Sequence, residues 1–193
     1  FCEAEGHACG SGARIWMHNN FLIDRTGKMS KSSGEFLRLP LLVFKGVHPL
    51  AYRLMCLQAQ YRSELEFGPD HILAALTRLK RLVMAVEGLR ARADLSDGLP
   101  SPDNSVVAEL DAAISDDLNT PKALTVLEAM LANKKASPVQ RLGTLQAFDT
   151  LLGLNLSELR RVELRLRPEN AALTEAEVET RIAERLEARN AKD

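Results

Sequence analysis

The sequence feature that most constrains the fold is an apolar repeat in the middle of the chain, which begins after Pro69. Steps of three and four residues separate its members, as expected for side chains along one face of a helix. The repeat comprises Ile72, Leu73, Leu76, Leu79, Leu82, Val83, Val86 and Leu89. A proline also suits the first turn of a helix. We therefore predict a long amphipathic helix that packs through this face.

Three more helices are predicted after a linker rich in Gly, Pro, Ser and Asp at 97–104. A hydroxyl residue followed by proline marks two of their starts, at Thr120 and at Ser137, where Gln140 completes a predicted capping box. The residues expected to be buried are Val106, Val107, Leu110 and Ile114 in the second helix, Leu124, Leu127, Met130 and Leu131 in the third, and Leu142, Leu145, Phe148 and Leu152 in the fourth. The chain is thus predicted to be mainly α-helical.

The C-terminal segment combines a basic cluster with a thin helical pattern. The cluster consists of Arg160, Arg161, Arg165 and Arg167. It suits either an RNA-facing patch or a flexible connector. Thr174 and Glu177 have the spacing of a capping box, and the apolar stripe that follows contains only Val178, Ile182 and Leu186. We expect a peripheral last helix. A solvated face is also favoured over RNA contact for the basic side of the long helix, which carries Arg78, Lys80, Arg81, Arg90 and Arg92.

Residues 14–24 are rich in aromatic and branched side chains and end in a turn sequence. We predict strands around 14–18 and 21–24, with Trp16 in a core and His18 either at a sheet edge or beside a site. Residues 36–44 fit a short strand or the start of a helix. His48 and Pro49 then open a buried helix, in which Cys56 is interpreted as a small core residue.

The segment between these elements, residues 27–34, has the sequence GKMSKSSG. It lacks apolar periodicity and has glycines at both ends, which favours an exposed, deformable loop. Lysine ammonium groups, serine hydroxyls and glycine-freed backbone N–H groups suit a polyanion. The spacing of a Walker phosphate loop is absent. On composition alone, a solvated surface loop is the commoner outcome.

Composition excludes several classes of protein. The net charge of −1 gives no global basic field, so a nucleic acid would be bound through local patches. Three cysteines favour a reducing, cytoplasmic setting over a disulfide scaffold, and no apolar run has the length of a membrane span. Cys2, His7, Cys9 and His18 invite a zinc hypothesis, but their spacing fits no standard structural site. We therefore predict no metal site in this chain.

Four short motifs, taken in order, resemble those of one family. Residues 28–32 match KMSKS, the loop of class I aminoacyl-tRNA synthetases, letter for letter. Residues 15–22 (IWMHNNFL) resemble the run that precedes this loop in cysteinyl-tRNA synthetases, residues 61–67 (YRSELEF) resemble its H-Y-R-S-x-L-x-F segment, and residues 116–121 (DDLNTP) resemble its D-D-x-N-T-P turn. The chain is identified as resembling a piece of a cysteinyl-tRNA synthetase, without the N-terminal catalytic part and the extreme C-terminus.

The resemblance implies a domain organisation. Residues 1–45 would be the end of a Rossmann-type catalytic domain, a small α/β remnant that carries the KMSKS loop. Residues 46–67 would be a helical connector similar to a stem-contact segment, and 68–155 a tRNA-binding-like helical bundle. Residues 156–193 would be a second connector with the peripheral helix.

The resemblance also implies an activity: ATP-dependent activation of L-cysteine to cysteinyl-adenylate, and transfer of cysteine to the 3′ end of a cysteine-specific tRNA. Lys31 is expected to contact ATP phosphate and Lys28 to assist it, as the catalytic pair. Met29, Ser30 and Ser32 complete the expected ATP-binding loop. The family's catalytic zinc would be held by ligands outside this chain. Because an H-I-G-H-like motif is also missing, the chain alone is expected to be inactive.

Two alternatives and two departures from the family pattern stay open. The cysteine ligase of mycothiol synthesis shares the loop but joins cysteine to an amino sugar, and a non-catalytic helical module could bind tRNA or protein. Glu35 and Gln60 stand where the family usually has asparagine and histidine, and either change could alter activity. For Asp116 and Asp117 we favour a role in a turn over a role in catalysis.

Overall fold

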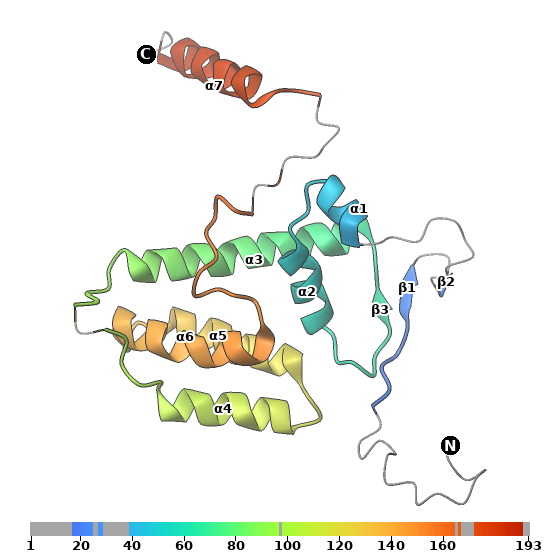
Figure 1. Cartoon of the computed structure of the whole chain (residues 1–193), viewed down its shortest axis with the longest axis vertical. Helices are drawn as coiled ribbons and strands as arrows, with labels where there is room; N and C mark the ends of the chain where they lie inside the picture. The colour runs from blue at the N-terminus through green and yellow to red at the C-terminus, as the bar shows by residue number, and fades with distance from the viewer. Residues whose placement is uncertain are drawn as a thin grey trace, which may run out of the picture.

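The computed structural model describes residues 17–24, 27–28, 39–96, 98–164, 166 and 172–190. The described chain is mainly helical, as predicted, with a small sheet near its N-terminal end (Figure 1). The helices are α1 (Leu39–Phe44), α2 (Pro49–Leu57), α3 (Pro69–Arg90), α4 (Asn104–Ser115), α5 (Thr120–Ala132), α6 (Pro138–Leu152) and α7 (Glu175–Asn190). The strands are β1 (Leu22–Asp24), β2 (Gly27–Lys28) and β3 (Leu65–Glu66).

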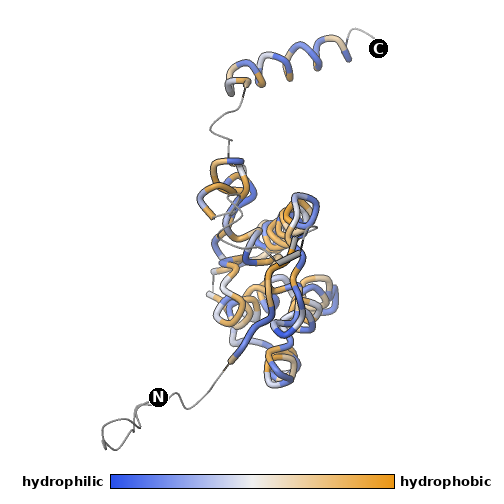
Figure 2. Tube along the Cα trace, turned by 90° about the vertical axis from the view of Figure 1, so that its right-hand side faces the viewer, coloured by the Kyte–Doolittle hydropathy of each residue, from blue (hydrophilic) through white to orange (hydrophobic). Residues whose placement is uncertain are grey.

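The long helix α3 is the centre of the bundle, because α2, α5 and α6 all pack against it. Its predicted apolar face is buried, with Leu79, Val83 and Val86 fully enclosed. Figure 2 shows apolar and hydrophilic residues alternating along the helices of the bundle. Leu73 is an exception, since it is 54% exposed. It lies at the edge of the apolar stripe, where the step of one residue from Ile72 turns the side chain outward.

The residues predicted to form the core in α5 and α6 are all buried, and Phe148 of α6 is completely enclosed. In α4, Leu110 is buried, whereas Val106, Val107 and Ile114 are only partly buried. Beyond α6 the core continues through four leucines that the mixed composition of this segment did not reveal: Leu154, Leu156, Leu159 and Leu164.

Side-chain caps fix most helix starts. His48 Nδ1 accepts a hydrogen bond from the Leu50 N–H at 3.2 Å, and Ser137 Oγ accepts one from the Gln140 N–H at 3.2 Å. Of the capping box predicted for α6, the bond to Ser137 Oγ is present, and the Gln140 side-chain amide donates to the Ser101 carbonyl at 3.0 Å. The compact linker brings that carbonyl within reach of the helix start.

The predicted cap of α5 is wrong by one residue. Thr120 is already helical, and Asn119 is the N-cap, with its Oδ1 accepting from the Lys122 N–H at 3.2 Å. An asparagine side chain caps at least as well as a threonine. Residue order alone could not decide between the two neighbours.

The small sheet has three strands in the order β2-β1-β3. β1 is antiparallel to β2 and parallel to β3, with Ile23 opposite both Lys28 and Glu66. The strand predicted at 21–24 is therefore confirmed. Of the strand predicted at 14–18, the described part, Met17 and His18, is not extended into a ladder, and Trp16 lies outside the described residues. The alternative at 36–44 resolves to a helix, α1.

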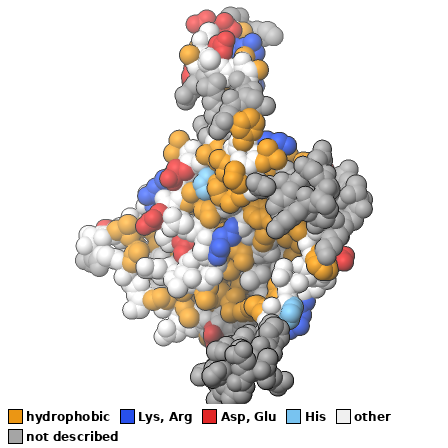
Figure 3. All heavy atoms as spheres, turned by 45° about the vertical axis from the view of Figure 1, so that its right-hand side comes forward, with side chains coloured by type: hydrophobic (Ala, Val, Ile, Leu, Met, Phe, Trp, Pro, Cys, Tyr) orange, Lys and Arg blue, Asp and Glu red, His pale blue; other side chains and the backbone are white. Residues whose placement is uncertain are grey.

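Both α1 and α7 expose apolar side chains at the surface. Figure 3 shows apolar side chains gathered on the face that it presents, and α1 buries only Leu42 while its other apolar side chains are exposed. At α7 the predicted capping box forms, because Thr174 Oγ1 accepts from the Glu177 N–H at 3.3 Å and the Glu177 carboxylate accepts from the Thr174 backbone N–H at 2.6 Å. Val178, Ile182 and Leu186 of α7 are all exposed.

Arg78 and Arg90, which belong to the face of the long helix predicted to be solvated, make contacts within the chain. Arg78 forms an ion pair with Glu128 at 2.7 Å, which ties α3 to α5. Arg90 donates to the carbonyls of Leu156, at 3.0 Å, and of Ser157. In the C-terminal cluster, the backbone N–H of Arg161 donates to Glu87 Oε1 at 2.8 Å, whereas Arg165 and Arg167 lie outside the described residues. No helix within the described ranges is long and apolar enough to cross a membrane.

Candidate functional site

The predicted lysine-serine loop, residues 28–32, begins at the end of β2. The backbone of Lys28 pairs with Ile23 of the central strand β1, so the loop leaves the sheet directly beside that strand. Met29, Ser30, Lys31 and Ser32 lie outside the described residues, as does Glu35. The described part of the site consists of β1, β2 and the segment between α2 and β3.

The segment between α2 and β3, residues 58–64, is called the connector from here on. It is hydrogen-bonded to the segment that leads into β1. The Asn20 N–H donates to the Tyr61 carbonyl at 2.9 Å, and the Asn20 side-chain amide donates to the Arg62 carbonyl at 3.1 Å. The ladder continues with Leu65 N–H to Phe21 O at 3.1 Å and Phe67 N–H to Ile23 O at 2.7 Å. Two of the four sequence motifs thus lie side by side.

A third motif joins them through one carboxylate, that of Asp117. Its Oδ1 accepts from the Tyr61 hydroxyl at 2.7 Å, and its Oδ2 accepts from Arg62 Nε at 2.8 Å. Gln60 Nε2 donates to the Asp117 carbonyl at 3.2 Å, and Gln60 Oε1 accepts from the Arg62 N–H at 2.6 Å. We call Gln60, Tyr61, Arg62 and Asp117 the Asp117 junction. It links the α4–α5 turn to the connector.

Both Arg62 and Tyr61 stabilise the ionised form of the Asp117 carboxyl. Hydrogen bonding from Arg62, and then from Tyr61, lowers the pKa of the Asp117 carboxyl below its usual range. The same carboxylate raises the pKa of the Tyr61 hydroxyl. The Arg62 guanidinium also lies 5.1 Å from the centre of the Tyr61 ring. At neutral pH the junction therefore contains an ionised aspartate that accepts from a protonated tyrosine and a charged arginine.

The α4–α5 turn presents Asp117 in an unusual conformation. Asp117 and Leu118 have φ angles of 50° and 54°, a region that residues other than glycine seldom occupy. The Leu118 N–H donates to the Ile114 carbonyl at 3.0 Å, and the Asn119 side chain donates to Asp116 at 3.2 Å. Asp116 thus has the predicted local role in the turn. Asp117 contacts a distant segment, which sequence order could not indicate.

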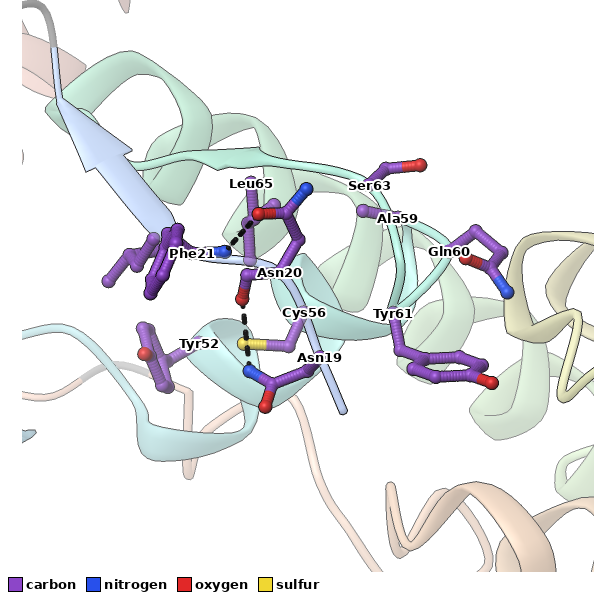
Figure 4. A pocket seen from close by; sticks show the side chains of 11 residues that line it. Asn19, Asn20, Phe21, Tyr52, Cys56, Ala59, Gln60, Tyr61, Ser63 and Leu65 are labelled. Atoms are coloured by element: carbon purple, nitrogen blue, oxygen red, sulfur yellow. Dashed lines mark hydrogen bonds between the residues drawn. The ribbon is translucent and has the colours of Figure 1, made fainter. Parts of the chain in front are cut away.

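A pocket of about 220 Å³ lies beside the junction, between the β1 segment and α2 (Figure 4). Tyr52 and Cys56 of α2 form one wall, and Asn20 and Phe21 form another. Gln60 and Tyr61 lie at the far side from Phe21 and Tyr52, as Figure 4 shows. Cys56, predicted to be a small core residue, is only half-buried: it packs against the core and also lines this pocket.

Burial raises the pKa of the Cys56 thiol, so the thiol stays protonated at neutral pH. We expect alkylation of Cys56 by iodoacetamide to reach its half-maximal rate at a higher pH in the folded chain than in urea, because only the thiolate reacts. Peptide mass spectrometry across a pH series would measure this. A folded-state midpoint at or below the unfolded one would contradict the assignment.

Of the four zinc candidates, the structure describes only His18. His18 is exposed, and Cys2, His7 and Cys9 lie outside the described residues. Among the residues that can be placed, no group of three or more His, Cys, Asp or Glu side chains is arranged to hold a metal ion.

Comparison with known proteins agrees with the motifs. The family described as tRNA synthetases class I (C) catalytic domain matches residues 2–77. A protein of Novosphingobium aromaticivorans named Cysteine--tRNA ligase is 57% identical over all of this chain and 40% of its own length. The protein of the same name from Zymomonas mobilis is 45% identical, over 95% of this chain and 42% of its own length. Cysteine--tRNA ligase 1 of Burkholderia lata is 40% identical, over 94% and 35%.

The chain spans about 40% of the length of these curated relatives. The match extends across the loop, the connector and the helical bundle, since the first relative aligns with the whole chain. The chain belongs to the cysteinyl-tRNA synthetase family of class I aminoacyl-tRNA synthetases.

Proposed function

We propose that the enzyme containing this chain is a cysteine-tRNA ligase. The observation that supports this most strongly is the match of the whole chain to relatives of that name, with the KMSKS loop intact at residues 28–32. In the first step, a carboxylate oxygen of L-cysteine attacks the α-phosphorus of ATP, and pyrophosphate leaves. In the second, a hydroxyl at the 3′ end of tRNA attacks the acyl carbon, and AMP leaves.

The chemistry assigned to this chain is electrostatic. Charge builds up on the departing pyrophosphate, and preorganised cations stabilise it. We assign phosphate contact to Lys31 and assistance to Lys28, with Met29, Ser30 and Ser32 completing the ATP-binding loop. The mounting of the loop on the short hairpin β1–β2 is compatible with closure on ATP and release of pyrophosphate.

The remaining groups needed for the reaction are proposed to lie elsewhere in the whole enzyme. They include the second nucleotide motif and the ligands of the zinc ion expected to bind the substrate thiol. We therefore propose that these 193 residues do not charge tRNA by themselves. The helical bundle that follows the connector is proposed to contact tRNA.

Lys31→Ala in the whole enzyme should reduce cysteine-dependent ATP–pyrophosphate exchange at least about tenfold, or roughly 1.4 kcal/mol of transition-state stabilisation. The physical reason is the loss of one cation opposite the developing charge. Exchange of labelled pyrophosphate into ATP measures this step without tRNA. Lys80→Ala, which removes an exposed lysine of α3, is the matched control and should retain full exchange. Equal activity of the two variants would reject the role of Lys31.

A further inference from the structure

We propose that Asp117 is a positioning residue for the lysine-serine loop. It fixes the connector at 60–62 against the α4–α5 turn and thereby holds the strand from which the loop departs. This inference rests on the proposed function, because one of its two readouts is a step of that reaction. The other readout, local backbone protection, is independent of any activity.

The first argument is the solvent exposure of the junction. The side chains of Arg62 and Asp117 are 66% and 51% exposed, so their ion pair is in water and contributes little to global stability. Yet three consecutive residues all direct polar groups at this one aspartate. Bonds of this kind fix the relative position of two segments more than they stabilise the fold.

The second argument is the continuity of the hydrogen bonds from Asp117 to the loop. The carboxylate holds the side chains of Tyr61 and Arg62, and the carbonyls of the same two residues accept from Asn20. Asn20 Oδ1 in turn accepts from the Phe21 N–H at 2.8 Å, directly before β1. β1 then pairs with β2, which ends at Lys28.

The third argument is the weakness of the sheet itself. β1 has three residues and β2 and β3 have two each, too few to fix a loop by their ladder alone. The connector between α2 and β3 is irregular and largely at the surface. Its hydrogen bonds to Asp117 in the α4–α5 turn supply the support that the short strands lack.

The experiment compares Asp117→Ala with two other variants in the whole enzyme. Tyr61→Phe removes one bond of the junction and leaves the positive-φ turn untouched. Asp111→Asn, a change of an exposed carboxylate on α4, is the control. Amide hydrogen exchange would be followed at Asn20, Leu65 and Phe67, whose N–H groups join the β1 segment to the connector and β3. The KM for ATP and the KM for cysteine would be measured by pyrophosphate exchange.

For Asp117→Ala we expect amide exchange at those three positions to accelerate about tenfold, while the α3 amides keep their protection. The KM for ATP should rise about three- to tenfold with little change in the KM for cysteine. Tyr61→Phe should shift both quantities in the same direction by a smaller factor, and in the double variant the effects should be less than additive. Asp111→Asn should match the parent.

Three results would overturn the proposal. The first is parental amide exchange at Asn20, Leu65 and Phe67 in both junction variants. The second is loss of protection in α3 as well as at the connector, which would indicate a general structural role. The third is an equal rise in the KM for ATP and in the KM for cysteine. If the parent shows no pyrophosphate exchange, the proposed function fails, but the amide measurement still tests the role of Asp117.

Discussion

Replacing Phe148 with alanine is expected to lower the free energy of unfolding by about 3–5 kcal/mol, the usual cost of removing a buried aromatic ring. Phe148 is fully enclosed within α6, which packs against α3, α4 and α5. Neighbouring helices restrain one another, so the cavity left by the ring collapses only in part. Urea denaturation followed by far-ultraviolet circular dichroism would measure the loss.

Leu151→Ala is the matched control for this prediction. Leu151 lies in the same helix but is 50% exposed, and its loss should change the free energy of unfolding by less than about 0.5 kcal/mol. Similar losses for the two variants would contradict the packing described for α6. The transition of the parent should be single and cooperative, since one core cluster includes residues from α1 through α6. A gradual transition would count against a common core.

The second large effect on the free energy of unfolding is expected for two glycine-to-alanine substitutions. One lies in α6 and the other in α3, and their effects should have opposite signs. A Cβ added at Gly143 of α6 would lie 2.4 Å from the Pro100 carbonyl oxygen. Because backbone must move to relieve that contact, Gly143→Ala should destabilise the chain by about 1–3 kcal/mol. At Gly88 of α3 an added Cβ meets nothing within 4 Å. Gly88→Ala should therefore stabilise the chain by about 0.5–1 kcal/mol through helix propensity.

The comparison of these two variants isolates the close approach of the 98–104 linker to α6. Both replace a helical glycine with alanine, so the gain in propensity is common to them. Denaturant midpoints of the two variants and the parent would give the signs directly. If Gly143→Ala proved as stabilising as Gly88→Ala, the linker could not lie where Pro100 is placed.

Local signals predicted the helices well, for reasons visible in particular residues. The spacing of apolar side chains from Ile72 to Leu89 defined α3, proline at the first helical position marked α2, and a hydroxyl before proline marked α6. These signals act within a few residues along the chain. Errors occurred where neighbours compete, as at Asn119 and Thr120, or at the edge of a stripe, as at Leu73.

The Asp117 junction could not have been predicted in the same way. Tyr61 and Asp117 are 56 residues apart, and their contact depends on the tertiary arrangement of the connector and the α4–α5 turn. The residue types offered one indirect signal, because both belong to motifs of the same family. Gln60, interpreted from sequence as a departure of unknown effect, proves to hydrogen-bond with both Asp117 and Arg62. The strands β2 and β3 have only two residues each, which is too short for a periodic pattern of apolar residues to predict them.

The most direct test of the central claim is the choice of acceptor by the whole enzyme after activation of cysteine. Purified enzyme would be given ATP and labelled L-cysteine with either tRNA or the amino sugar used by mycothiol-type ligases. We predict cysteine in ester linkage to tRNA and no product with the amino sugar. An amide product with the amino sugar, or no product with either acceptor, would contradict the assignment of this chain to a cysteine-tRNA ligase activity.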